Sequence, residues 1–198
     1  MRGVQGYIFV SPGSDPGAGR PLADPIFARV TTMGMCRPDL RRQVQKGDSL
    51  FVLSGKLDGV QQYLIGGLSV GQQLDALAAL AKFPDNKLKQ LEDGSKTGNI
   101  IVTATGERDP LDHHAAKTFK QRIQNFIIAK DAIYLAAQKE VELARQRTLD
   151  ILRRVFDKPK AESVHKLIYR GRVLDEKQIA MLVEALESIK SDAGVQPR

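Results

Sequence analysis

The distribution of glycine and proline changes abruptly along the chain. The first 110 residues contain 15 glycines and 7 prolines, whereas residues 111–156 contain neither. Because both residues interrupt regular structure, this contrast predicts short strands and turns in the first half and helices in the second. Strands followed by helices in this order are typical of an α+β fold and not of regular βαβ winding.

Apolar segments rich in β-branched and aromatic residues predict the strands. They lie at residues 6–10, 26–34, 49–56, 61–75 and 100–106. Residues 49–56 and 61–75 are expected to form a hairpin, because Leu57–Gly59 supplies residues that a tight turn prefers. Gly66 and Gly67 indicate a bulge or a close approach of another part of the chain.

Helices are predicted where apolar residues recur at helical spacing. These segments are residues 74–83, 137–156 and 175–190. Asp175 is the expected N-cap of the last helix. Pro38 followed by Asp39 predicts a further short helix, since proline is favoured in the first helical turn. Residues 125–135 are ambiguous, because their β-branched content suits a strand and their lack of breakers suits a helix.

The positive charge lies mainly in the second half of the chain. The net charge is +7, and residues 113–198 hold 17 basic and 11 acidic side chains, whereas residues 1–112 are almost balanced. A basic half suits contact with nucleic acid or another polyanion. A solvated helical surface gives the same pattern, so charge alone does not choose between the two interpretations.

The composition also bears on the cellular compartment. One cysteine is present, which excludes an internal disulfide and favours a reducing, cytoplasmic location. No apolar run approaches the length of a membrane span, and the N-terminus lacks the apolar region of a signal peptide. We therefore expect no contact with a membrane.

Three arginines cluster in residues 35–56, MCRPDLRRQVQKGDSLFVLSGK. In the short predicted helix, Arg37 and Arg41 share one face, and Arg42 follows. Guanidinium groups bind phosphate oxygens through two parallel hydrogen bonds, so this face is a candidate phosphate site. The alternative is a set of surface ion pairs with Asp39 that contribute little to stability. Cys36 has no histidine near it in the sequence, so it is interpreted as a packing residue and not as a nucleophile.

The segment DPLDHH, residues 109–114, holds the candidate catalytic groups. Asp112 with His113 or His114 is predicted to serve as an acid/base pair if the protein is an enzyme. The alternative is a helix start, with Asp112 as its cap. Adjacent histidines point apart and the chain lacks paired zinc-ligand spacings, so no metal and no cofactor are expected.

Further basic residues extend the predicted phosphate-binding set. Residues 11–20 contain glycines but lack the Lys-Ser/Thr pair of a phosphate-binding loop, so Arg20 is the residue of interest there. A flexible glycine separates two arginines at residues 170–172, which are expected to face a nucleic-acid backbone. The additional candidates are Arg20, Lys56, Arg170 and Arg172.

Residues 31–56 and the following YLIGGLSV resemble the nucleotide modification associated domain 2 family. The shared pattern is a threonine and a cysteine, a basic residue and proline, paired arginines, and Gly-Asp before a strand that ends in a Ser-Gly turn. The matching positions are Thr32, Cys36, Arg37, Pro38, Arg41, Arg42, Gly47, Asp48, Ser54 and Gly55. Residues 125–135 are also similar to a strand pair of that family, which favours a strand at Phe126–Ile128.

This resemblance implies a bacterial or phage protein connected with modified nucleotides and found near base-modifying or phage-defence systems. It also implies a small β-barrel-like sheet similar to the PUA and EVE group, whose members bind modified bases and generally do not catalyse. We therefore predict a β-rich nucleotide- or base-binding domain over residues 1–135 and a helical C-terminal extension over residues 136–198 that packs on it.

The predicted function is binding of DNA or of a nucleotide that carries a modified base. The alternative is a glycosylase- or transferase-like enzyme that uses the Asp-His pair. The C-terminal helices are a further candidate surface for a protein partner.

Overall fold

The computed structural model describes residues 3–194. Its contacts divide the chain into two compact units, each assembled from separate segments. Unit 1 comprises the chain up to residue 22, residues 47–69 and the chain from residue 132 onward, and unit 2 comprises residues 23–46 and 70–131. These units do not coincide with the predicted boundary at residue 135, because the helices after it share a unit with the first strand. The roles assigned to the two predicted domains stay predictions.

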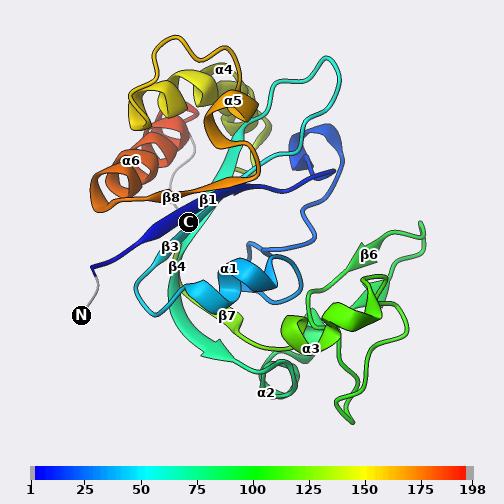
Figure 1. Cartoon of the computed structure of the whole chain (residues 1–198). Helices are drawn as coiled ribbons and strands as arrows, with labels where there is room; N and C mark the ends of the chain where they lie inside the picture. The colour runs from blue at the N-terminus through cyan, green and yellow to red at the C-terminus, as the bar shows by residue number, and fades with distance from the viewer. Residues whose placement is uncertain (1–2, 195–198) are drawn as a thin grey trace. The chain divides into compact units, whose positions relative to one another are not determined.

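Within the described residues, unit 1 contains three α-helices, one short 3₁₀ helix and strands of the sheet that include one of its edges (Figure 1). Its elements are β1 (Gly6–Val10), η1 (Pro16–Ala18), β3 (Ser49–Leu53), the first part of β4 (Leu64–Leu74), α4 (Gln138–Val155), α5 (Val164–Ile168), β8 (Gly171–Leu174) and α6 (Glu176–Asp192). Strand β1 pairs in parallel with β3 and antiparallel with β8, while β3 pairs antiparallel with β4. Strands β1 and β3 are apolar and buried along most of their length, as is typical of strands covered on both faces.

The helices of unit 1 form from clear amphipathic patterns. Helix α4 buries one face, made of Val141, Ala144, Thr148, Ile151, Leu152 and Val155. The Asp175 side chain caps α6 by accepting a hydrogen bond from the Gln178 backbone N–H at 2.8 Å. In return, the side-chain oxygen of Gln178 accepts a hydrogen bond from the Asp175 backbone N–H. Helices α4, α5 and α6 lie together beside β1 and β8 (Figure 1).

Unit 2 has shorter elements around two small apolar clusters. Its elements are β2 (Thr32–Met33), α1 (Pro38–Gln43), the end of β4, α2 (Ala76–Lys82), η2 (Pro84–Asn86), β5 (Lys89–Gln90), β6 (Lys96–Thr97), η3 (Ala116–Thr118), α3 (Phe119–Arg122) and most of β7 (Phe126–Tyr134). Ile100 and Val102 belong to one cluster with Phe126, and Ile101 belongs to the other with Met35. This alternation follows from an extended backbone, whose successive side chains point to opposite sides.

The strands follow the order β2-β7-β4-β3-β1-β8 in a six-stranded, mostly antiparallel sheet. The mixed α+β class predicted from sequence is therefore confirmed. The order is linear and ends at β2 and β8 among the described residues, so it does not show the barrel-like closure that the resemblance implies. No helix within residues 3–194 is long and apolar enough to cross a membrane.

Several local predictions are confirmed, but the strand expected at residues 26–34 is limited to β2, and the strand expected at residues 100–106 is absent. The helix expected at residues 137–156 is α4, and Phe126–Ile128 begins a nine-residue strand. A Cβ on Gly66 would lie 2.5 Å from the Ile133 carbonyl oxygen, which explains the glycine as a close approach. Residues 100–106 form no strand, because their backbone makes only isolated bridges, Lys87 with Ile100 and Val102 with Arg108.

Candidate functional site

The three arginines near α1 occupy different environments. Arg37 precedes the helix in a left-handed conformation (φ 48°), and its guanidinium contacts the Asp39 carboxylate at 2.8 Å. This is the predicted surface ion pair, and the hydrogen bond from Arg37 lowers the pKa of Asp39. Arg42 is exposed, whereas Arg41 is fully buried. The prediction that Arg37 and Arg41 present one surface face is therefore wrong.

The Arg41 guanidinium holds together two segments of unit 2 that are more than 80 residues apart in sequence. Its Nε donates to the Cys36 carbonyl oxygen at 3.0 Å, and its Nη2 donates to the Arg122 carbonyl oxygen at 2.8 Å. Its Nη1 donates to the carbonyl oxygens of Gln124 and of Asn125, the latter at 3.0 Å. With its donors occupied in this way, Arg41 is a structural residue and is not placed to bind an external phosphate.

A buried carboxylate balances the charge of Arg41. Asp24 is 1% exposed and accepts hydrogen bonds on both oxygens. The donors are the backbone N–H groups of Gly34, Met35 and Cys36, at 2.6–3.0 Å, and the Asn99 side chain at 3.0 Å. Burial raises the pKa of Asp24, while Arg41 opposes that rise, and burial lowers the pKa of Arg41 to about 10. Arg41 therefore stays charged at neutral pH.

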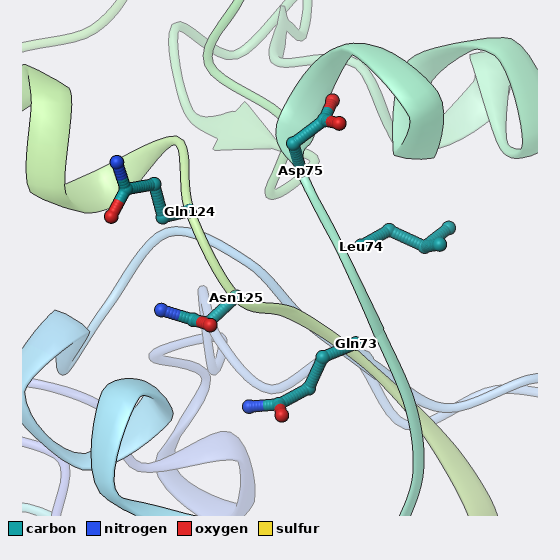
Figure 2. A pocket seen from close by; sticks show the side chains of 5 residues that line it. All are labelled: Gln73, Leu74, Asp75, Gln124 and Asn125. Carbon is teal, nitrogen blue, oxygen red and sulfur yellow. The ribbon is translucent and has the colours of Figure 1, made fainter.

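One segment that Arg41 holds, residues 122–125, contributes two residues to the lining of an open depression of about 430 Å³. Its lining residues are Gln73, Leu74, Asp75, Gln124 and Asn125. Figure 2 shows the amide groups of Gln73, Gln124 and Asn125 on one side of the two chain segments, while Leu74 points to the other side.

Two hydrogen-bond patterns fix the walls of this depression. The Gln73 side chain donates to the Arg41 carbonyl oxygen at 2.7 Å, so the same arginine orients both walls. Asn125 has a left-handed backbone (φ 55°), which asparagine tolerates better than most residues. Oδ1 of the Asp75 carboxylate caps α2 by accepting from the N–H groups of Leu77 and Ala78. The depression therefore presents three amide side chains and the Asp75 carboxylate to a ligand, with one N–H of Gln73 and Oδ1 of Asp75 already engaged.

The predicted Asp-His pair forms between Asp112 and His114. Nδ1 of His114 lies 2.6 Å from Oδ1 of Asp112, and Arg108 Nε donates to the other carboxylate oxygen at 2.8 Å. Nη2 of Arg108 also donates to the carbonyl oxygens of Asp112 and His114. The ring of His113 stacks on that of His114, with centroids 4.6 Å apart. Of the two candidate histidines, His114 is thus the one that contacts the carboxylate.

The charge states of this pair follow from burial and hydrogen bonding. Burial raises the pKa of Asp112, but the hydrogen bonds from Arg108 and His114 outweigh it and bring that pKa below the ordinary carboxyl value. Burial lowers the pKa of His114 below its ordinary value, and Asp112 opposes this effect. A neutral imidazole held by an ionised carboxylate has the charge states of a general base.

Cys36 is not activated for nucleophilic attack. Burial raises the pKa of its thiol to about 12, and the Asp24 carboxylate adds to the rise. Its side chain packs against the apolar cluster that contains Met35, Leu88 and Ile101. Because the thiolate is the nucleophile, the packing role is the one that this environment supports.

The remaining predicted phosphate residues all belong to unit 1. Arg20 is exposed and ends a loop that closes through backbone hydrogen bonds between Asp15 and Arg20, while the buried Asp15 side chain pairs with Arg145 of α4 at 2.6 Å. Lys56 is exposed beside Gly55, and Arg170 is exposed before β8. The Arg172 guanidinium stacks on the Phe156 ring, 4.3 Å from its centroid. The predicted residues are therefore divided, with Arg37, Arg41, Arg42, Asp112, His113 and His114 in unit 2 and Arg20, Lys56, Arg170 and Arg172 in unit 1.

No sequence pattern predicted the amide residues or Arg108. The signal for Arg108 was its position four residues before Asp112. The amides carry no motif, because Gln73 and Asn125 approach each other only through the folding of unit 2.

Comparison of the chain with known protein-family models gives no match, and comparison with curated protein sequences gives none either.

Proposed function

We propose that the chain is a nucleic-acid or nucleotide binding module whose unit 2 recognises a modified base in the depression between Gln73 and Asn125. The observation that carries the proposal is the set of three amide side chains that line one depression. Asparagine and glutamine amides present a donor beside an acceptor, the pattern that matches the edge of a base. A depression of about 430 Å³ also falls in the range of small-molecule sites.

Preorganisation supports the same proposal. Arg41 fixes the backbone of Gln124 and Asn125 and accepts from the Gln73 amide, so these walls need little ordering when a ligand binds. The link to DNA modification or phage defence, the cytoplasmic location and the PUA- or EVE-like barrel come from the sequence resemblance and are part of this proposal. A protein partner that binds the C-terminal helices is also part of this proposal.

The test is calorimetric titration of the full chain with deoxynucleoside monophosphates that carry unmodified, methylated or hydroxymethylated bases. Gln124→Ala removes one amide, and Asn125→Gly removes another while suiting the positive φ. Each substitution is expected to weaken binding about 5- to 150-fold, the cost of one lost amide–base pair. Gln121→Ala, on the exposed surface of α3, is the matched control. If no nucleotide binds, or if Gln124→Ala and Gln121→Ala behave alike, the depression is not a base-binding site.

A second candidate function is favoured by the 2.6 Å contact between Asp112 and His114. In this alternative the chain is a glycosylase- or transferase-like enzyme that acts on a nucleotide or a base, with neutral His114 as the general base and Asp112 holding its ring. His114→Asn is then expected to abolish product formation from modified nucleotides or DNA, whereas His113→Asn retains it. Absence of any product with these substrates, followed by chromatography, rules out the enzymatic alternative.

A further inference from the structure

The strongest concentration of positive charge in the chain lies in unit 1. Residues 153–172 contain seven lysines and arginines and two acidic residues, within a chain whose net charge is +7. We call this set the basic surface, and its members are Arg153, Arg154, Lys158, Lys160, Lys166, Arg170 and Arg172.

Side-chain contacts connect the parts of the chain that carry the basic surface. Arg153 Nε donates to the Ala161 carbonyl oxygen at 2.8 Å, which ties the end of α4 to the following loop. Arg172, at the start of β8, packs on the Phe156 ring and donates to the Leu167 carbonyl oxygen at 3.1 Å. The end of α4, the loop, α5 and the start of β8 therefore form one neighbourhood.

Two ion pairs within residues 3–194 involve members of the basic surface. Arg153 pairs with Asp150 and Lys166 pairs with Glu162, and all four side chains are at least 31% exposed. Exposed pairs of this kind contribute little free energy, so a phosphate group competes with them readily. The basic surface thus has the charge complementarity that a polyphosphate backbone requires.

Tyr169 adds an aromatic ring beside Arg170 of the basic surface. Its side chain is 63% exposed, the most exposed of the large apolar residues described. Its backbone lies in a positive-φ conformation (φ 54°, ψ −104°) that non-glycine residues rarely adopt. Such conformations are costly and concentrate at functional sites. The Arg170 guanidinium lies 5.7 Å from the ring centroid, and the His165 ring meets it edge-on at 5.2 Å.

We propose that the basic surface of unit 1 binds single-stranded nucleic acid, with Tyr169 as the residue on which an unpaired base stacks and with Lys158, Lys160 and Arg170 contacting the phosphates. Cationic side chains that follow the backbone, combined with an exposed aromatic ring, are how proteins hold single strands without reading sequence. A duplex keeps its bases stacked inside, so it presents phosphates to this surface but no base to the ring. The proposal does not require the depression in unit 2.

The test is fluorescence anisotropy of a labelled single-stranded oligothymidylate with the full chain across a range of salt concentrations. Tyr169→Ala is expected to weaken binding about 5- to 150-fold, the contribution of one stacked base. Tyr169→Phe keeps the ring and retains the affinity. Tyr169→Gly suits the positive φ and therefore keeps the fold, but it loses the same affinity. Val173→Ala, which shortens a neighbouring exposed side chain, is the matched control and leaves binding unchanged.

The phosphate contacts are tested separately through the salt dependence. For single strands the slope of log K against log salt is about −0.7 per phosphate contact, so the double variant Lys158→Ala/Lys160→Ala reduces it by about 1.4. Lys46→Ala/Lys89→Ala removes the same charge from unit 2 and serves as the control. The proposal is overturned if Tyr169→Ala and Val173→Ala bind alike, if a duplex binds as tightly as the single strand, or if only an acidic peptide binds.

These outcomes are independent of the base-binding proposal. Loss of monophosphate binding in Asn125→Gly with unchanged oligonucleotide binding supports both sites. Monophosphate binding that persists while Tyr169→Ala has no effect overturns the single-strand site alone.

Discussion

Replacement of Arg41 by methionine is the sharpest test of how unit 2 is held together. Methionine has a similar length and is apolar, so Arg41→Met removes the charge and the donors while leaving little empty volume. It leaves four carbonyl oxygens without their donor and leaves the buried Asp24 carboxylate without its countercharge. Removing one partner of a buried charge pair costs about 3–5 kcal/mol.

That cost is a large part of the free energy of unfolding of a typical domain, about 5–15 kcal/mol. With a urea dependence of about 2 kcal/mol per molar, the unfolding midpoint of Arg41→Met falls by about 2 M. The assay is urea unfolding followed by far-ultraviolet circular dichroism, since the chain contains no tryptophan. Arg42→Met, which changes the exposed neighbour, is the control and shifts the free energy of unfolding by no more than about 0.5 kcal/mol.

A double-mutant cycle separates the charge pairing from the packing. Asp24→Asn removes the carboxylate charge, and the double variant with Arg41→Met is expected to lose about 0.5–3 kcal/mol less than the sum of the single losses. A loss below about 1 kcal/mol for Arg41→Met, or strict additivity with Asp24→Asn, refutes the conclusion that this guanidinium holds the walls of the depression.

Three further outcomes are expected. The lowered pKa of His114 favours the neutral ring in the folded state. The contribution of His114 to stability is therefore present above pH 6.5 and is lost as the pH falls through the folded pKa. In His114→Gln, the thermal unfolding temperature is expected to lose this dependence on pH. Asp175→Ala removes the N-cap of α6 and lowers the free energy of unfolding in urea by about 1 kcal/mol, and no loss contradicts the capping role. Gly66→Ala forces a Cβ against the Ile133 carbonyl and costs about 1–3 kcal/mol by the same measurement, whereas Gly3→Ala, whose Cβ would meet its nearest atom at 3.4 Å, costs no more than about 0.5 kcal/mol.

Local signals predicted the elements that depend on few neighbours. The amphipathic pattern of α4 and the capping residue Asp175 each need only adjacent turns or residues to take effect. Residues 100–106 have the same local character as a strand, but the chain beside them offers only isolated bridges. Strand formation depends on a partner that the segment itself does not encode, so this prediction failed.

In the candidate site, too, contacts between residues close in sequence were predicted and long-range contacts were not. The contact between Asp112 and His114 spans two residues, and the sequence predicted the pair. The spacing of Arg37 and Arg41 predicted a shared helix face, but it did not reveal that carbonyl groups from residues 122–125 cover Arg41. The depression depends on the same long-range contacts, so no local sequence pattern predicts that its amides lie together.

The chemistry of the two proposed sites leads to different responses to salt. Gln73, Gln124 and Asn125 are neutral, and the neighbouring cation Arg41 is bonded to carbonyl oxygens, so base binding in the depression releases few counterions. The basic surface around Tyr169 acts through lysines and arginines, so binding there weakens steeply as salt rises. A chain that binds a modified nucleotide almost independently of salt and a single strand with a steep salt slope therefore uses both sites. A steep slope for the nucleotide alone instead locates its phosphate, and not its base, as the group that is recognised.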